Sequence, residues 1–131
     1  MDKISELQKE HSEIKGLLSK IENSIDNNVN GEFIVELFDD LDKTWNRHEK
    51  REEKIFNKIV RYGKMPFEKM LLNEHRELRG HWKVLRIAMD PVKKMFRVAL
   101  DTDGRMLIRK LKEHIAIEDK FIEKLIDPRF R

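Results

Sequence analysis

The sequence predicts an all-α fold, an up-down-up-down four-helix bundle with a short extra helix between the third and fourth long helices. Charged residues make up 40% and apolar residues 39% of the 131 residues, and only 5 Gly and 3 Pro interrupt them. This mixture favours amphipathic helices over strands. In four long segments, apolar residues also recur every three or four positions, which is the period of a helix with one buried face. A chain of this length is expected to form a single domain, residues 1–131.

The first two segments are expected to form the first pair of long helices. The first runs from about Asp2, which can cap it, to Ile25, and an asparagine-rich stretch then turns the chain. The second runs from about Glu32 to Tyr62, where Gly63 can supply the C-terminal turn.

The remaining two long helices are expected on either side of a break. The third segment starts at Pro66, at the first turn of a helix, and reaches Met89. Asp90-Pro91 predicts a break, followed by a short helix to about Leu100. The Asp-Thr-Asp sequence at 101–103 is expected to cap the last long helix.

Composition excludes several kinds of site. The chain has no cysteine, which excludes disulfides, thiolate zinc sites, iron–sulfur clusters and cysteine nucleophiles. Any metal must therefore be held by imidazole and carboxylate groups. The N-terminus lacks the apolar core of a signal peptide, and no apolar run approaches the roughly 18 to 20 residues that span a bilayer, so a cytoplasmic protein without a membrane partner is expected. The net charge is +3, and because the signs alternate along the chain no basic stripe is legible and no nucleic-acid partner is expected.

Polar residues fill gaps in the apolar stripes of all four long segments. In the first, the helical spacing from Leu7 to Ile14 is kept only if His11 lies on the same face. Burying one such side chain among Leu and Ile costs several kcal/mol unless something compensates it, so a whole set needs a common explanation. The set comprises four of the five histidines and two glutamates: His11, His48, Glu52, His75, His114 and Glu118.

These six residues are expected to meet. Counted from the helix ends, the four histidines fall at about one level of an up-down bundle, at a rise of about 1.5 Å per residue. The pairs His48/Glu52 and His114/Glu118 are each four positions apart, which places both side chains on one helix face. Four imidazoles and two carboxylates form a plausible set for two transition metals, each with two histidines, with bridging glutamates and a water-derived oxygen. Iron, zinc, copper or manganese would suit these ligands, and ligand softness alone does not choose among them.

The pattern resembles the hemerythrin family, specifically the hemerythrin-like HHE cation-binding domains, over nearly the whole chain. Two H-x-x-x-E elements form the specific part of the resemblance. The resemblance implies a non-haem di-iron centre in a four-helix bundle, with two iron ions and a bridging oxo or hydroxo group, often binding O2 reversibly. The motifs that carry the resemblance are Glu10-His11, the sequence HEKREEKIF at 48–56, Glu74-His75 and the sequence HIAIED at 114–119.

Two departures bear on function. Oxygen-carrying members of the family usually have two histidines four apart on the third helix, but Leu71 and Arg79 stand four positions before and after His75. The last helix offers Glu118 where those members have Asp. The six-ligand set therefore looks more like the repair, iron-sensing and other non-carrier branches, which argues against a simple oxygen-storage role.

We expect a di-iron protein that binds O2, NO or peroxide for carriage, sensing or delivery. The alternatives are a di-iron enzyme, namely an oxidase, a peroxidase or a nitric-oxide-handling enzyme, and a metal-free helical interaction module. No catalytic residue is assigned, and the oligomeric state is left open. Glu53 and Asp119, one step beyond the inner face, are expected to be solvated or to support the ligands. His81 lies about 120° from the ligand direction of His75 and is expected at the surface or flank.

Overall fold

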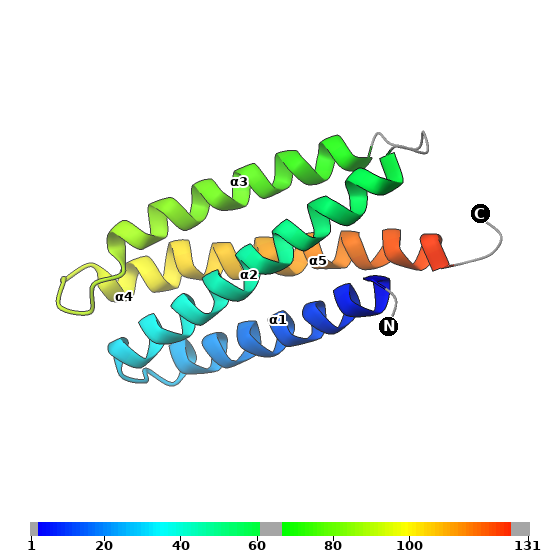
Figure 1. The fold of residues 1–131 in the computed structure, drawn as a ribbon. Helices are drawn as coiled ribbons and strands as arrows, with labels where there is room; N and C mark the ends of the chain where they lie inside the picture. Colours follow the sequence, from blue (N-terminus) through cyan, green and yellow to red (C-terminus); the bar gives the residue numbers. More distant parts are fainter. Residues whose placement is uncertain (1–2, 61–66, 127–131) are drawn as a thin grey trace.

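Four long helices form the body of the protein and run alternately in opposite directions (Figure 1). The computed structural model describes residues 3–60 and 67–126, and these residues form no strand. The fold is therefore all-α, as predicted. The elements in chain order are α1 (Lys3–Asp26), α2 (Gly31–Val60), α3 (Phe67–Ala88), the short α4 (Phe96–Ala99), a π-helical turn η1 (Leu100–Gly104) and α5 (Arg105–Ile126).

The long helices pack in a ring, in which α1 contacts α2, α2 contacts α3, α3 contacts α5, and α5 contacts α1. The apolar stripes face inward and form two buried clusters. The larger cluster surrounds Leu18, Leu41 and Leu111, and the smaller one comprises Leu7, Ile55 and Ile122. On α1 and α2 the predicted polar residues lie between these two clusters in the sequence, and on α5 they lie between Leu111 and Ile122, so a polar layer divides the apolar core.

The first turn of the chain follows the prediction closely. Helix α1 ends at Asp26, and Asn28 adopts a left-handed φ of 53°, which stops the helix and is better tolerated by Asn than by most residues. The expected cap at Asp2, the stop at Tyr62-Gly63 and the start at Pro66 lie outside the described residues.

The predicted cap at 101–103 is wrong. The chain passes from α4 through η1 into α5 without a break, and the residues that flank η1 keep right-handed helical φ and ψ. The Thr102 hydroxyl donates to the carbonyl of Val98, and Arg105 Nε contacts Asp101 Oδ1 at 3.3 Å, both across the four-residue spacing of a continuing helix. The break at Asp90 is confirmed, since Asp90 Oδ1 accepts the Val92 amide in a turn, but the short helix that follows begins only at Phe96.

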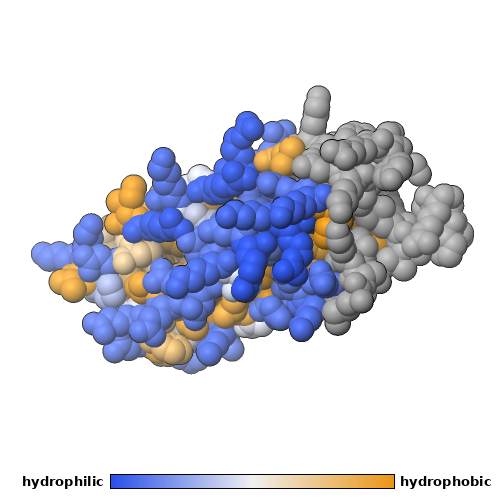
Figure 2. Space-filling view, in the orientation of Figure 1, coloured by the Kyte–Doolittle hydropathy of each residue, from blue (hydrophilic) through white to orange (hydrophobic). Residues whose placement is uncertain are grey.

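The surface over α2 is mainly hydrophilic in the view of Figure 2. Among the described residues, no helix is both long enough and apolar enough to cross a membrane.

Candidate metal centre

The six predicted residues all lie in the polar layer, each with an exposed fraction of no more than 2%. Helices α1 and α3 contribute one histidine each, and α2 and α5 each contribute a histidine and a glutamate one turn later. The structure therefore brings together the whole predicted set: His11, His48, Glu52, His75, His114 and Glu118.

The six residues form two groups of four that share both glutamates. One group contains His11 and His48 and the other contains His75 and His114, and each includes Glu52 and Glu118. Within each group, one ligand atom from every residue lies within 4.8 Å of the others. Each group could therefore hold a cation, and the two groups share both carboxylates.

The histidines of each group meet through the same ring nitrogen. The Nε2 atoms of His11 and His48 are 3.1 Å apart, and those of His75 and His114 are also 3.1 Å apart. Glu52 directs one oxygen to each pair, with Oε2 2.8 Å from His48 Nε2 and Oε1 2.9 Å from His75 Nε2. Oε1 of Glu118 lies 3.3 Å from Nε2 of both His11 and His114.

Each histidine uses its other nitrogen, Nδ1, to contact a carboxylate on a neighbouring helix. Such a contact makes Nδ1–H the donor and leaves a lone pair on Nε2 of the neutral ring. The four imidazoles are thereby oriented as ligands, with Nε2 facing the centre. The contacts are His11 with Asp119 (2.6 Å), His48 with Glu10 (3.0 Å), His75 with Glu53 (3.2 Å) and His114 with Glu74.

Cations outside the centre hold three of these carboxylates in turn. Arg51 lies 3.1 Å from Glu10, and Lys15 donates to Asp119 at 3.0 Å. Arg79 donates to Glu53 and to the buried Glu49, at 3.2 Å in both cases. Arg79 stands four positions after His75, one of the two positions tested above for a second histidine, and here it supports His75 through the carboxylates.

Sequence reasoning found part of this outer layer. The expectation that Glu53 and Asp119 support the ligands is confirmed by their contacts with His75 and His11. The same role for Glu10, Glu74 and Glu49 was missed, although each adjoins a histidine of the predicted set in sequence. His81 lies outside the centre, partly exposed and 3.8 Å from Glu77 on its own helix, as expected.

The centre fits a cation because its inner atoms are not satisfied by protein donors. Both carboxylate oxygens of Glu118 and Oε2 of Glu52 are buried with no hydrogen-bond partner among the described residues, because nearby imidazole nitrogens do not align with them. A buried carboxylate whose oxygens lack hydrogen bonds destabilises the folded protein by several kcal/mol. If both rings of a pair are neutral and donate outward from Nδ1, their Nε2 lone pairs face each other at 3.1 Å and repel. Protons or metal ions must therefore lie between these groups.

In the metal-free protein, protons fill this role. Burial lowers the pKa of His11, but its contacts with Glu118 and Glu52 outweigh burial and raise that pKa to about 9. The same balance raises the pKa of His48 to about 10 and that of His114 to about 11, and the pKa of His75 is also raised. Burial favours a higher pKa for Glu52, yet its contacts with Glu118 and the histidines hold that pKa well below the usual range.

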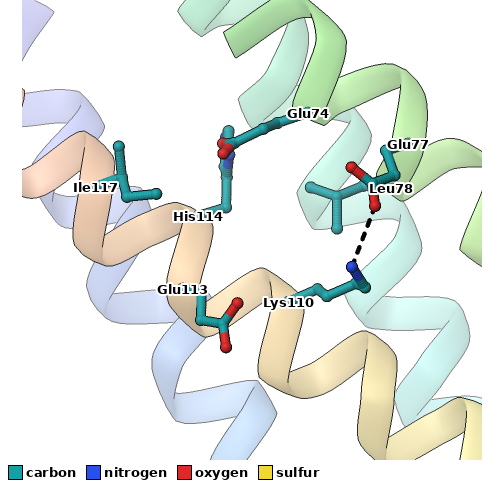
Figure 3. A pocket seen from close by; sticks show the side chains of 7 residues that line it. All are labelled: Glu74, Glu77, Leu78, Lys110, Glu113, His114 and Ile117. Atoms are coloured by element: carbon teal, nitrogen blue, oxygen red, sulfur yellow. Dashed lines mark hydrogen bonds and ion pairs between the residues drawn. The ribbon is translucent and has the colours of Figure 1, made fainter. Parts of the chain in front are cut away.

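A pocket of about 90 Å³ lies beside His114, between α3 and α5 (Figure 3). His114 and Glu74 form one wall of the pocket, and the apolar side chains of Leu78 and Ile117 also line it. Lys110 donates to Glu77 across it at 3.1 Å. A volume of this size admits only small molecules.

Comparison with known proteins agrees with the geometry. The sequence model of the hemerythrin HHE cation-binding domain matches residues 2–125. Neither a curated protein nor a solved structure gives a significant match. Because the match covers nearly the whole chain and the buried His/Glu clusters fit a metal site, this metal-binding chain belongs to the hemerythrin HHE cation-binding domain family.

Proposed function

We propose that this protein is a non-haem di-iron protein that binds O2 or a related small ligand, NO or peroxide, for carriage, sensing or delivery. One observation carries the proposal. Two pairs of buried imidazoles, each with its Nε2 atoms 3.1 Å apart, share the carboxylates of Glu52 and Glu118. The ligands would be the six buried residues, with His11 and His48 on one ion and His75 and His114 on the other.

The charge of the centre supports two divalent ions. The pKa values of His11, His48 and His114 are raised to about 9, 10 and 11, so these rings hold protons at neutral pH, and the pKa of His75 is raised as well. Two divalent ions would bring four positive charges to the centre in place of these protons. Exchanging these protons for metal ions would keep positive charge opposite the surrounding carboxylates, and two divalent ions would supply more of it than one.

The ligand set supports iron and a small exogenous ligand. Two imidazoles with shared carboxylates resemble the histidine–carboxylate sets that hold non-haem iron with open positions. When bound there, an iron pair supplies redox change and positions for a small ligand. The residues of this chain would orient the imidazoles through their Nδ1 contacts and exclude bulk water, because the inner atoms are buried. The small pocket beside His114 favours a ligand of a few atoms over a large substrate.

The test is anaerobic reconstitution with ferrous iron, followed by metal analysis and absorption spectroscopy. We expect two iron ions per chain and a spectrum that changes on addition of O2 and again with azide. A Glu118→Gln variant should lose iron, whereas Glu113→Gln, on the exposed face of the same helix, should load normally. One metal per chain, or a spectrum indifferent to O2, NO and azide, would contradict the proposal.

The same preparation separates the other hypotheses. An enzyme would consume peroxide or NO in large excess over protein, whereas a carrier or sensor would bind about one ligand per centre. A metal-free interaction module would show the same melting curve with and without a chelator.

A further inference from the structure

The outer face of α2 carries a row of charges that is antisymmetric about Lys43. Three acidic residues lie 11, 7 and 4 positions before Lys43, and three basic residues lie 4, 7 and 11 positions after it. Spacings of 4, 7 and 11 keep side chains on one face of a helix. We call these seven residues the charged ridge: Glu32, Glu36, Asp39, Lys43, Arg47, Lys50 and Lys54.

The charged ridge is exposed and has no partner within the described part of the chain. All seven side chains are exposed, and none forms an ion pair with another described residue. Several other surface charges are paired, for example Lys110 with Glu77 at 3.1 Å, and Arg51 beside the ridge is held by Glu10. The basic half also borders an open groove that is lined by five cationic side chains and one amide: Lys43, Asn46, Arg47, Lys50, Arg51 and Lys54.

The order of the charges favours one kind of partner. An acidic protein or a nucleic acid would suit the basic half but would be repelled by the acidic half of the same ridge. A partner that satisfies both halves must present the opposite charges in reverse order at the same spacings. A second copy of α2, rotated about a two-fold axis through Lys43, meets this requirement by symmetry.

We propose that the charged ridge docks against the same ridge of a second copy, with the two α2 helices antiparallel. The axis places Glu32, Glu36 and Asp39 of one copy opposite Lys54, Lys50 and Arg47 of the other, so each pair occurs twice, as in any isologous contact. The two Lys43 side chains meet at the axis. Asp40, exposed and without an ion pair among the described residues, lies three positions away in each copy and relieves their repulsion.

This contact is reversible and depends on ionic strength. No apolar residue belongs to the ridge, and exposed ion pairs are individually weak. The Debye length falls from about 30 Å at 0.01 M salt to about 3 Å at 1 M. Association should therefore occur at high protein concentration in low salt and disappear as salt is added.

The experiment is sedimentation velocity of the whole protein, over a wide range of protein concentration, at about 0.02 M and about 0.5 M salt. We expect a monomer–dimer equilibrium whose dissociation constant rises at least about tenfold between these conditions. The variant Arg47→Glu/Lys50→Glu should be monomeric throughout. Its control, Lys83→Glu/Lys94→Glu, has the same change of net charge at exposed positions off the ridge and should dimerise like the wild type.

A complementary variant keeps the test independent of folding defects. Glu36→Lys/Asp39→Lys should also be monomeric alone, and mixing it with Arg47→Glu/Lys50→Glu should restore dimers, while circular dichroism checks that both are folded. A wild type that stays monomeric in low salt, or a dimer that persists in high salt or in the ridge variants, would overturn the proposal. So would binding of double-stranded DNA through the basic half without self-association.

Discussion

Metal binding should release protons from the centre. At pH 7.5 the metal-free protein keeps three inner histidines protonated, since the pKa values of His11, His48 and His114 are raised to about 9, 10 and 11. Only a neutral imidazole can bind a metal. A divalent ion that takes His11 and His48 should therefore release about two protons, and its apparent affinity should rise about 100-fold per pH unit between pH 7 and pH 9.

The assay is calorimetric titration with zinc or, without oxygen, ferrous iron, in two buffers of different ionisation enthalpy. The difference in observed heat gives the number of protons released. Replacing His114 by Gln should lower that number, whereas His81→Gln should leave it unchanged because His81 lies outside the centre. If metal binds with no proton release and with an affinity independent of pH, the histidines are not the groups it displaces, and the ligand assignment fails.

Three further predictions concern stability and the core. The raised pKa of His11 stabilises the metal-free fold by about 3 kcal/mol below pH 6.5, and this contribution should be lost as pH rises through about 9, as urea unfolding at pH 7 and pH 10 would show. The ring centroid of Trp45 lies within 6.3 Å of the centroids of three inner imidazoles, so bound iron should quench the fluorescence of Trp45. The Trp45→Phe variant should lose this quenching, and the Trp82→Phe variant should keep it. A Cβ at Gly31 would come 2.9 Å from a ring carbon of Phe96, so Gly31→Ala should lower the melting temperature. A Cβ at Gly16 would meet nothing within 4 Å, so Gly16→Ala should stabilise the fold by about 0.5–1 kcal/mol.

The inner residues could be predicted because helical spacing leaves few alternatives. Once the apolar stripe of α2 is fixed by Leu41, Trp45 and Ile55, His48 and Glu52 must lie on the same face. The pairing of histidines could not be predicted in this way. Which rings meet depends on which helices are neighbours in the ring and on side-chain rotamers, neither of which the spacing within one helix determines.

Two features were misjudged because only local sequence was considered. Residues 101–103 have the composition of a helix cap, but Leu100 and Gly104 beside them are buried, and the wider π-helical turn keeps both facing the core in a continuous helix. The charged ridge was overlooked for a related reason. Along the chain its basic half is interrupted by acidic residues such as Glu49 and Glu53, which helix geometry directs elsewhere.

The outer carboxylates follow a rule that the sequence does contain. On every long helix, the supporting carboxylate is adjacent in sequence to an inner residue, as in Glu10-His11, Glu52-Glu53, Glu74-His75 and Glu118-Asp119. Adjacent residues diverge by about 100° around a helix, so when one points to the centre the other points to the neighbouring helix. The contacts therefore run in one direction around the ring of helices, because the carboxylate of each helix contacts the histidine of the next helix in the ring.

This cyclic support predicts that the replacement of one carboxylate acts on a different helix from its own. Glu10 contacts His48 on α2, not the adjacent His11, so Glu10→Gln should weaken metal binding by about 10- to 100-fold through loss of the orientation of His48. Glu13→Gln, exposed on the same helix and away from the centre, is the matched control. Competition with a chromophoric chelator measures both affinities, and NMR of the imidazole nitrogens in the metal-free protein should show the change at His48 rather than at His11. Equal affinities for the two variants would mean that the imidazoles are held by the core alone.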